Sequence, residues 1–495
     1  MTEAAPTLLE LCVRRLALDV VRCGPKRRAS ARLSELPRRA HEALLGALVA
    51  KNALHDNVLS ELLTANIERL GLEGAYQLRR SVLGLIGQSC PNLRMLDVRR
   101  CQQVGNRFVR EVLQHCHFLE TLRLDGCTRI SDSAFLPPTG ALDKASAGFL
   151  GKKKKKSSAL PGLLRLHELT LGECSQITTA GLQDCIVVGA KSLRVLGLAF
   201  CRLAVTDEVV SSLLLDRGVE RIDLSFCSQV TDAPFGTGSP LPHLREIRLA
   251  DVPFTDEGAQ GLAHRAPQLE VFDGWALKLT DGGVCALASV CVRLRKLCVR
   301  STGITDAAFH DIARCRFLEH LDASWCLHAT SQALAILAAP TDKGGVHIEC
   351  RAPLRELVLD HLGGVLPALT SNVAPGPPPA LRQLVSAYSL GIQWLLLDGI
   401  SSVVSADALH AIAESCPDLR QLALAFQAGQ DSDGALKEGL CKVGSACHRL
   451  HLLRLNASGR PHHAIVEALA LPNFVRLRSL TLWCCGAAGG LQGSE

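Results

Sequence analysis

The sequence predicts an α/β solenoid in which short parallel strands line the inside of a curve and helices cover the outside. Three observations predict this fold. An apolar pattern returns about every 25 residues, cysteines recur at fixed places within it, and a helix-capping triplet follows it. One such unit cannot bury its own apolar face, so the units must stack. A chain of 495 residues, 47% of them hydrophobic, can bury a large core in this way.

The repeated pattern has the form LxxLxLxxC, as in LETLRLDGC from residue 119. Between Leu166 and Leu318 the successive units are 27, 26, 25, 25, 25 and 24 residues apart, which is room for one strand, one helix and two turns. Nine clear units and four less regular ones begin at the following residues: Leu93, Leu119, Leu166, Leu193, Val219, Leu244, Leu269, Leu294 and Leu318, then Leu354, Leu419, Leu450 and Leu477.

Each part of the unit has a physical role. The alternating leucines of LxLxxC point to one side of a short strand, and the small, apolar cysteine continues the buried row where the chain leaves the strand. The following ITD, VTD or ISD triplet supplies an apolar anchor and an oxygen-bearing side chain that caps a helix. A helix of about ten residues is then expected, such as DAAFHDIARC after Ile304, with its apolar face on the strand.

Changes in composition divide the chain into four regions. Residues 1–65 form a helical capping or adaptor-binding region, and residues 66–339 hold the regular repeats. A disordered insertion at about 136–160 contains GKKKKKSS, which is either a solvated loop or a nuclear import signal. Residues 340–400 contain loosened repeats with Pro/Gly-rich insertions, and residues 401–495 hold the C-terminal repeats and a tail.

The cysteines belong mainly to the repeat. Thirteen of the 21 recur at two places in it, either at the turn after the strand or three residues before the first leucine. No CxxC pair has zinc spacing, so reduced thiols in a reducing compartment are expected, with no metal and no cofactor. We also expect no secretory leader, no membrane span and no nucleic-acid partner, because apolar runs are short and the net charge of +6 is modest.

The cysteine-bearing unit, with its CPxL lead-in and ITD or LTD exit, resembles the cysteine-containing leucine-rich repeats of F-box/LRR and ribonuclease-inhibitor-like proteins. The resemblance covers residues 67 to 485 with interruptions. It implies an α/β leucine-rich-repeat solenoid used as a recognition surface, frequently the substrate-binding arm of a ubiquitin ligase. The periodicity by itself predicts only the solenoid.

The inner face of the curve is the candidate substrate surface. Its charges are of both signs, which argues against a groove that follows phosphates. Aromatic residues recur just before the turn cysteine, where they either pack between neighbouring turns or anchor a ligand. The candidate substrate-binding residues are Arg99, Arg123, Phe200, Phe226, Arg248, Arg300 and Trp325.

The first residues do not fit the repeat. In TLLELCVRRL, residues 7–16, Leu8, Cys12 and Leu16 fall four apart on one side of a helix. The stretch resembles the BC-box of Elongin C-binding substrate receptors, and the layout of the first helices is similar to that of Zyg/Zer receptors. The resemblance implies that Leu8 and Cys12 insert into an apolar pocket on Elongin C. Leu36 and Pro37 resemble the cullin-selecting element of von Hippel-Lindau-type boxes.

Three interpretations of these helices stay open. They bind an Elongin C-type adaptor, or LSELPRRAHEALLGAL is an F-box helix that docks on a Skp-type adaptor, or they only cap the solenoid. The sequence contains no GxGxxG, P-loop, HExxH or GxSxG motif, so we expect no catalysis. The hypothesis is a cytoplasmic or nuclear substrate receptor of a cullin-type ubiquitin ligase; the alternative is a protein-binding scaffold or inhibitor without a ligase.

Overall fold

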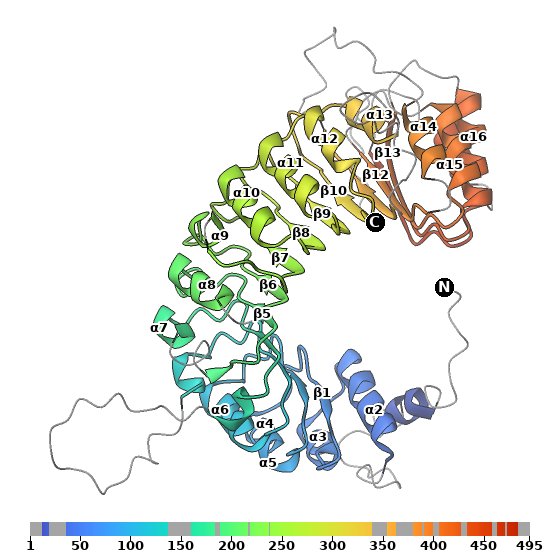
Figure 1. Ribbon diagram of the computed structural model, residues 1–495. Helices are drawn as coiled ribbons and strands as arrows, with labels where there is room; N and C mark the ends of the chain where they lie inside the picture. The colour runs from blue at the N-terminus through green and yellow to red at the C-terminus, as the bar shows by residue number, and fades with distance from the viewer. Residues whose placement is uncertain are drawn as a thin grey trace, which may run out of the picture. The chain divides into compact units, whose positions relative to one another are not determined.

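Strands form where the repeat predicts them, and the three-residue strands from β2 to β11 are each centred on the second apolar residue of their LxxLxLxxC unit. In the computed structural model, fifteen strands of the described residues follow one another in chain order in a parallel sheet (Figure 1). The chain divides into two compact units, Met1–Val230 and Thr231–Glu495. Within each unit, strands lie along the inner side and helices along the outer side. The protein is thus an α/β leucine-rich-repeat solenoid.

The structure describes the following residues: 12–18, 36–136, 160–183, 189–215, 218–236, 238–338, 354–362, 380–388, 391–398, 405–426, 433–457, 463–470 and 473–483. The lysine run at 152–156 and the Pro-rich segment at 374–379 therefore lie outside the described residues.

The first unit contains six described strands and a series of mostly short helices. The strands are β1 Arg69–Gly71, β2 Met95–Asp97, β3 Thr121–Arg123, β4 Glu168–Thr170, β5 Val195–Gly197 and β6 Arg221–Asp223. The helices are α2 Arg38–Ala50, α3 Asp56–Leu62, α4 Arg80–Leu83, α5 Ile86–Ser89, α6 Asn106–His115, α7 Thr179–Gly181 and α8 Asp207–Leu214, with 3₁₀ turns η2 Asp132–Ala134 and η4 Pro161–Leu163.

The second unit contains nine described strands, which become longer toward the C-terminus. The strands are β7 Glu246–Arg248, β8 Val271–Asp273, β9 Lys296–Cys298, β10 His320–Asp322, β11 Glu356–Val358, β12 Trp394–Leu397, β13 Gln421–Phe426, β14 Leu452–Ala457 and β15 Ser479–Trp483. The helices are α9 Ala233–Gly236, α10 Asp256–Arg265, α11 Asp281–Val290, α12 Asp306–Ile312, α13 Gln332–Ala338, α14 Ala380–Ala387, α15 Ala406–Ser415, α16 Asp433–Ala446 and α17 His463–Ala470.

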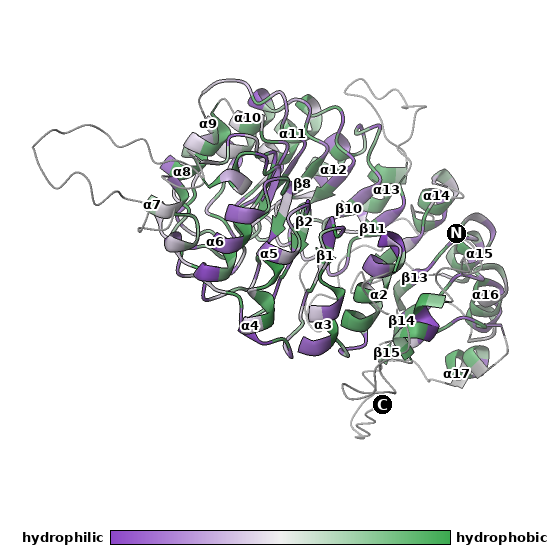
Figure 2. Ribbon diagram, turned by 90° about the horizontal axis from the view of Figure 1, so that it is seen from below, coloured by the Kyte–Doolittle hydropathy of each residue, from purple (hydrophilic) through white to green (hydrophobic). Residues whose placement is uncertain are grey.

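The core is a stack of equivalent side chains from successive repeats. Leu70, Leu96 and Leu122 are in register across β1, β2 and β3, and each is fully buried. Figure 2 shows hydrophobic and hydrophilic residues alternating along the helices, as expected where one helix face packs on the strands. No helix in the part of the chain that the structure describes has both the length and the apolar composition of a membrane span.

The turn cysteines within the described residues are buried, as predicted, and they also donate hydrogen bonds. The Sγ of Cys127 lies 3.2 Å from the carbonyl oxygen of Val98 in the preceding repeat, and Cys201, Cys227 and Cys326 make equivalent contacts at 3.2 Å. The Val98 carbonyl also accepts from the Cys101 N–H at 3.2 Å, so the thiol is its second donor. A carbonyl oxygen has two lone pairs, and cysteine can use the second one while filling a small apolar space, which leucine and valine cannot do.

The capping triplet does more than cap its own helix. Thr305 caps α12, since its Oγ1 accepts a hydrogen bond from the N–H of Ala307. The Asp281 carboxylate, at the start of α11 in the preceding repeat, accepts bonds from the Thr305 N–H at 2.8 Å and from its Oγ1 at 2.7 Å. We call this pair of hydrogen bonds between neighbouring repeats an Asp–Thr staple. Four further pairs make it: Asp132 with Thr178, Asp232 with Thr255, Asp256 with Thr280 and Asp306 with Thr330.

Some elements differ from the sequence expectation. The helix after Ile304 has seven residues rather than about ten, and α9 has only four. Pro234 and Gly236 lie within α9, and both residue types disfavour a continuing helix. Strand β12 was not among the expected units. It lacks a turn cysteine and follows the Pro-rich segment, so its LxL pattern is not evident in the sequence.

We predict that Asp281→Ala lowers the free energy of unfolding by about 1–3 kcal/mol, because it leaves two donors of Thr305 without their acceptor. Urea denaturation followed by far-ultraviolet circular dichroism measures the change. The control is Glu438→Gln, which removes an exposed i,i+4 pair with Lys442 and should leave the free energy of unfolding nearly unchanged. Equal changes in the free energy of unfolding for the two substitutions would contradict a stabilising role for the Asp281–Thr305 hydrogen bonds.

Candidate functional site

The N-terminal segment has one buried side and one exposed side. Residues 12–18 are helical, and Val13 and Ala17 are buried on the side that packs into the protein. Cys12 is exposed and Leu16 is half-buried, so the apolar positions of the BC-box-like pattern lie on a different side of the helix. Leu8 lies outside the described residues. An apolar face that the chain itself does not cover is available to a partner.

The second predicted element lies at the start of α2. Pro37 is the N-cap of this helix and is exposed, and Leu36 is half-buried. The rest of α2 packs against the open edge of β1, where the Arg69 N–H donates to Glu42 at 3.2 Å and Leu44 is fully buried. Helix α2 therefore covers the end of the solenoid and still leaves its first turn accessible.

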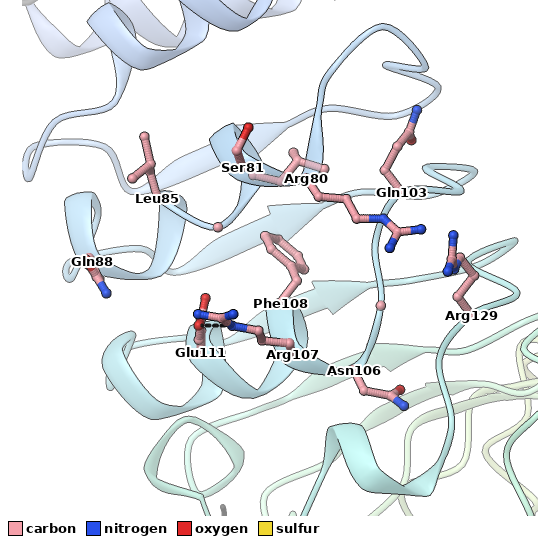
Figure 3. A pocket seen from close by; sticks show the side chains of 13 residues that line it. Arg80, Ser81, Leu85, Gln88, Gln103, Asn106, Arg107, Phe108, Glu111 and Arg129 are labelled. Carbon is pink, nitrogen blue, oxygen red and sulfur yellow. Dashed lines mark hydrogen bonds and ion pairs between the residues drawn. The ribbon is translucent and has the colours of Figure 1, made fainter.

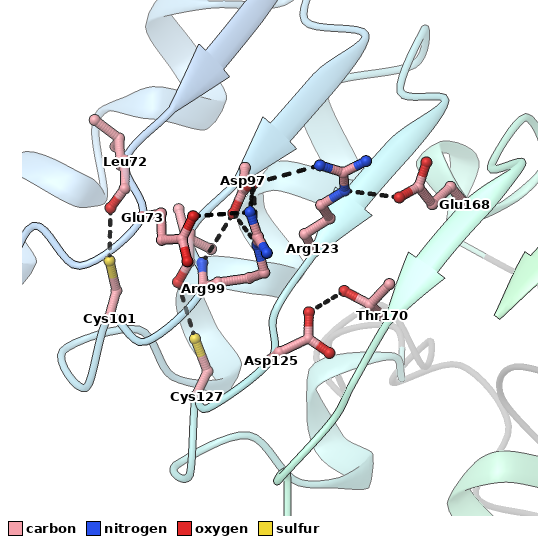
Figure 4. A network of polar contacts seen from close by, with 11 residues as sticks. Leu72, Glu73, Asp97, Arg99, Cys101, Arg123, Asp125, Cys127, Glu168 and Thr170 are labelled. Carbon is pink, nitrogen blue, oxygen red and sulfur yellow. Dashed lines mark hydrogen bonds and ion pairs between the residues drawn. The ribbon is translucent and has the colours of Figure 1, made fainter. Parts of the chain in front are cut away.

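Charged residues on the inner face of the first unit neutralise one another. The Arg99 guanidinium bonds to Asp97 at 2.8–3.1 Å and to Glu73 at 2.8 Å, and Arg123 bonds to Glu168 at 2.7 Å (Figure 4). The hydrogen bonds that Arg99 donates to Asp97 raise the pKa of Arg99, and the bond that Arg123 donates to Glu168 raises the pKa of Arg123. Both predicted arginines therefore support the local structure, although about a third of each side chain is exposed.

A second set of charges runs along the residues just before the strands. Arg94 lies between Glu68 and Glu120, and Arg295 pairs with Glu319 at 2.6 Å. Arg194 with Glu220 and Arg245 with Glu270 make the same contact at 2.8 and 2.6 Å. Opposite charges therefore alternate from repeat to repeat. Since the residues are exposed, this charge ladder contributes little stability, but it disfavours a wrong register.

The aromatic residues before the turn cysteine stack on their neighbours. Phe200 and Phe226 have ring centroids 4.1 Å apart and an interplanar angle of 10°. Trp325 stacks on His361 in the same way, at 4.2 Å and 6°. All four residues have φ between 57° and 63°, in the left-handed region that seldom accepts such side chains. Non-aromatic residues at the same repeat position, such as Asp251 and Ala276, also have positive φ, so the turn belongs to the repeat and the rings stack on it. Phe200 and Trp325 remain 41% and 44% exposed.

The remaining predicted residues lie in the second unit. Arg248 pairs with Glu246 at 2.7 Å, and the Arg300 guanidinium lies 5.8 Å from the ring centroid of Trp275. Sequence reasoning did not select Trp275 or His361. The repeat alignment could have identified both residues. Trp275 stands at the same position of its repeat as Arg300, and His361 stands at the same position as Trp325. We use the name aromatic–cationic cluster for four residues of neighbouring repeats: Trp275, Arg300, Trp325 and His361.

The cysteines divide into buried and accessible thiols. Burial raises the pKa of Cys116, Cys127, Cys291 and Cys416 to about 12, so these thiols are not reactive near neutral pH. All described cysteines are free, and Cys12 alone among them is classed as exposed. Among the described residues, no group of three or more His, Cys, Asp or Glu side chains gathers in a way that could hold a metal ion.

Comparisons with known proteins agree with the fold. No protein-family model matches the sequence. The chain is similar to Rad7 in the crystal structure of the yeast Rad7 and Elc1 complex, with a TM-score of 0.50 and 14% identity over 88% of this chain and 98% of that one. It is also similar to an internalin of Listeria monocytogenes, with a TM-score of 0.42 and 14% identity over 91% and 97% of the two chains. At 14% identity, the likeness to Rad7 shows a similar fold and nothing further.

We predict that Asp360→Asn stabilises the second unit near neutral pH. Burial raises the pKa of Asp360 from 3.8 to about 6, so the folded state binds a proton more tightly than the unfolded state. Ionising Asp360 therefore costs stability as the pH rises from about 4 to 6 and above. Asparagine keeps the acceptor for the Asp398 N–H, which lies 2.8 Å from Oδ1.

Thermal unfolding at several pH values measures this effect. The gain from Asp360→Asn should reach about 2 kcal/mol near pH 7.5 and disappear near pH 4. The control Asp418→Asn, in an exposed pair with Arg449, should show no such gain. A stability difference for Asp360→Asn that does not change with pH would contradict the interpretation.

Proposed function

We propose that this protein is a non-catalytic substrate receptor of a cullin-type ubiquitin ligase, acting in the cytoplasm or the nucleus. Its N-terminal helices would bind an Elongin C-type adaptor, and the inner face of the repeats would bind the protein substrate. The observation that carries the proposal is the N-terminal segment, where Val13 and Ala17 are buried while Cys12 is exposed and Leu16 only half-buried.

The similarity to Rad7 supports the choice of adaptor. That protein was crystallised with Elc1, an Elongin C-type protein, and nearly all of its chain is matched by this one. An F-box docked on a Skp-type adaptor fits the geometry less well. Helix α2 begins at the Leu36-Pro37 pair, but Leu44, Leu45 and Leu48 on it are buried within the protein and not free to dock.

The aromatic–cationic cluster is the best candidate for a substrate contact. Trp325 is 44% exposed and Trp275 is 36% exposed, and Arg300 reaches the ring of Trp275. Tryptophan and arginine dominate the binding energy of many protein interfaces because they combine a large apolar surface with directional donors. The receptor would hold its substrate near a ubiquitin-loaded enzyme, so the mechanism is a raised effective concentration.

A protein-binding scaffold without a ligase is the second candidate function. It is favoured by the position of α2, which covers the edge of β1 as a simple solenoid cap would. The two functions differ in one property only, which is whether the N-terminal segment captures an adaptor.

We predict that Cys12→Arg reduces capture of a purified Elongin B/C pair by about 100-fold, because a charge would replace the small apolar side chain on the docking face. The repeats should keep their circular dichroism, since Cys12 is exposed. The matched control is Arg14→Ala on the same segment, also exposed, which should bind normally. Capture of a Skp-type adaptor instead would assign the chain to the F-box class, and capture of neither would leave the scaffold function.

We also predict that the adaptor protects Cys12 from alkylation. Iodoacetamide applied to the native protein should modify Cys12 rapidly and the buried repeat cysteines slowly, as mass spectrometry of peptides would show. Adding Elongin B/C should slow the modification of Cys12 and leave the half-buried Cys285 unchanged. Unchanged labelling of Cys12 in a complex that does form would place the adaptor elsewhere on the chain.

A further inference from the structure

The first unit has an open groove on its helical side, away from the strands of the inner face. Its volume is about 670 Å³, and it lies between the short helices α4 and α5 and the start of α6. Among its lining residues are three arginines, Arg80, Arg107 and Arg129, and a single carboxylate, Glu111. The lining therefore carries an excess of two positive charges.

Two of these arginines have nothing to neutralise them. Within the described part of the chain, the exposed side chains of Arg80 and Arg129 take part in no hydrogen bond or ion pair. Figure 3 shows the two guanidinium groups reaching toward each other over the chain near Gln103. Elsewhere in this unit, arginines such as Arg94, Arg99 and Arg123 face carboxylates. Two like charges that converge without a counterion favour the binding of an anion.

The backbone fixes the positions from which these two side chains project. Arg80 is the first residue of α4, and Arg129 forms a backbone bridge to Gly105, the N-cap of α6. Gly105 has no side chain to cap the first turn of α6, whose N–H groups add to the positive potential around the arginines. Arg107 contributes a third guanidinium. Its side chain is 90% exposed, and its pair with Glu111 at 2.8 Å is a weak surface ion pair.

We propose that this groove binds a phosphorylated serine or threonine within an extended peptide segment. Guanidinium groups bind phosphate through paired, charge-assisted hydrogen bonds, and a tetrahedral anion can engage two or three of them at once. The groove is larger than a phosphate group, and the half-exposed Leu85 and the ring of Phe108 line it beside the arginines. These apolar residues give flanking side chains of a peptide a surface to contact.

The charge pattern favours a peptide over a nucleic acid. A nucleic acid presents a continuous row of phosphates and needs cations along its whole path. Here the cations form one cluster, and the neighbouring exposed Arg79 is already paired with Asp56. The proposal does not depend on adaptor binding, because the groove lies apart from residues 12–18 and from Pro37 in the sequence and uses none of them.

The first measurement uses the full chain and two fluorescent peptide mixtures that differ only in a central phosphothreonine or threonine, flanked by randomised residues. Fluorescence anisotropy should show that the phosphorylated mixture binds at least about tenfold more tightly. Inorganic phosphate should compete weakly. Equal binding of the two mixtures would overturn the proposal, as would inorganic phosphate binding as tightly as the peptides or a random single-stranded RNA binding more tightly at the same groove.

Three variants locate the site. Arg80→Gln with Arg129→Gln should lower phosphopeptide affinity by about tenfold or more, and the fold should persist because neither side chain has a partner. Glu111→Gln should tighten binding, since it releases Arg107 and removes the only carboxylate of the lining. The control Arg79→Gln removes one positive charge next to the groove and should bind normally. Binding that falls equally in the double variant and in Arg79→Gln would show a non-specific charge effect and refute the site.

Discussion

The structure depends on hydrogen bonds between side chains of one repeat and the backbone of the next. Most strands are only three residues long, so a strand pair supplies few backbone bonds and little burial of its own. The turn cysteines, the Asp–Thr staples and the charge ladder add contacts at up to three places between neighbouring repeats. Each kind of contact joins a repeat only to its neighbour. The free energy of folding of such a chain is therefore approximately a sum of contributions from neighbouring repeats. The same contacts fix how each repeat is aligned with the next, and so where its exposed side chains lie.

This fixed register determines which surfaces can bind a partner. On the inner face of the first unit, Arg99 and Arg123 are held by carboxylates, so their charges are largely committed to the structure. In the second unit, the aromatic–cationic cluster combines exposed rings with a cation. On the helical side, Arg80 and Arg129 project into the groove proposed to bind a phosphopeptide, and among the described residues no carboxylate pairs with them. Surfaces of different chemistry thus arise from one repeat, because positions outside the core can vary freely.

Much of the fold could be predicted from the sequence, since the pattern that defines a repeat consists of its buried residues. The strand positions, the buried turn cysteines and the threonine caps of α10, α11 and α12 are confirmed. The partner of each staple was not predicted. The aspartate of ITD binds the threonine of the next repeat, and only stacking brings the two together. Strand β12 escaped notice because the residues that mark a repeat, above all the turn cysteine, are missing there.

The candidate sites were predictable in part. The pattern Leu8, Cys12, Leu16 predicted a docking face, but only the structure shows that Cys12 is exposed while its neighbour Val13 is buried. The aromatic residues were visible as a periodic position, whereas their left-handed backbone and their stacking were not. The groove near Arg80 and Arg129 could not be predicted from any motif or spacing in the sequence. It is assembled from three successive repeats, and its charge balance depends on which arginines find carboxylates.

Hydrogen–deuterium exchange of the full chain, with and without a purified Elongin B/C pair, tests the central claim most directly. The account predicts that the adaptor slows exchange in the N-terminal segment around Cys12 and at the start of α2, and leaves the strands of both units unchanged. Slower exchange confined to the repeats, or no change at saturating adaptor, would contradict a receptor that docks through its N-terminal helices.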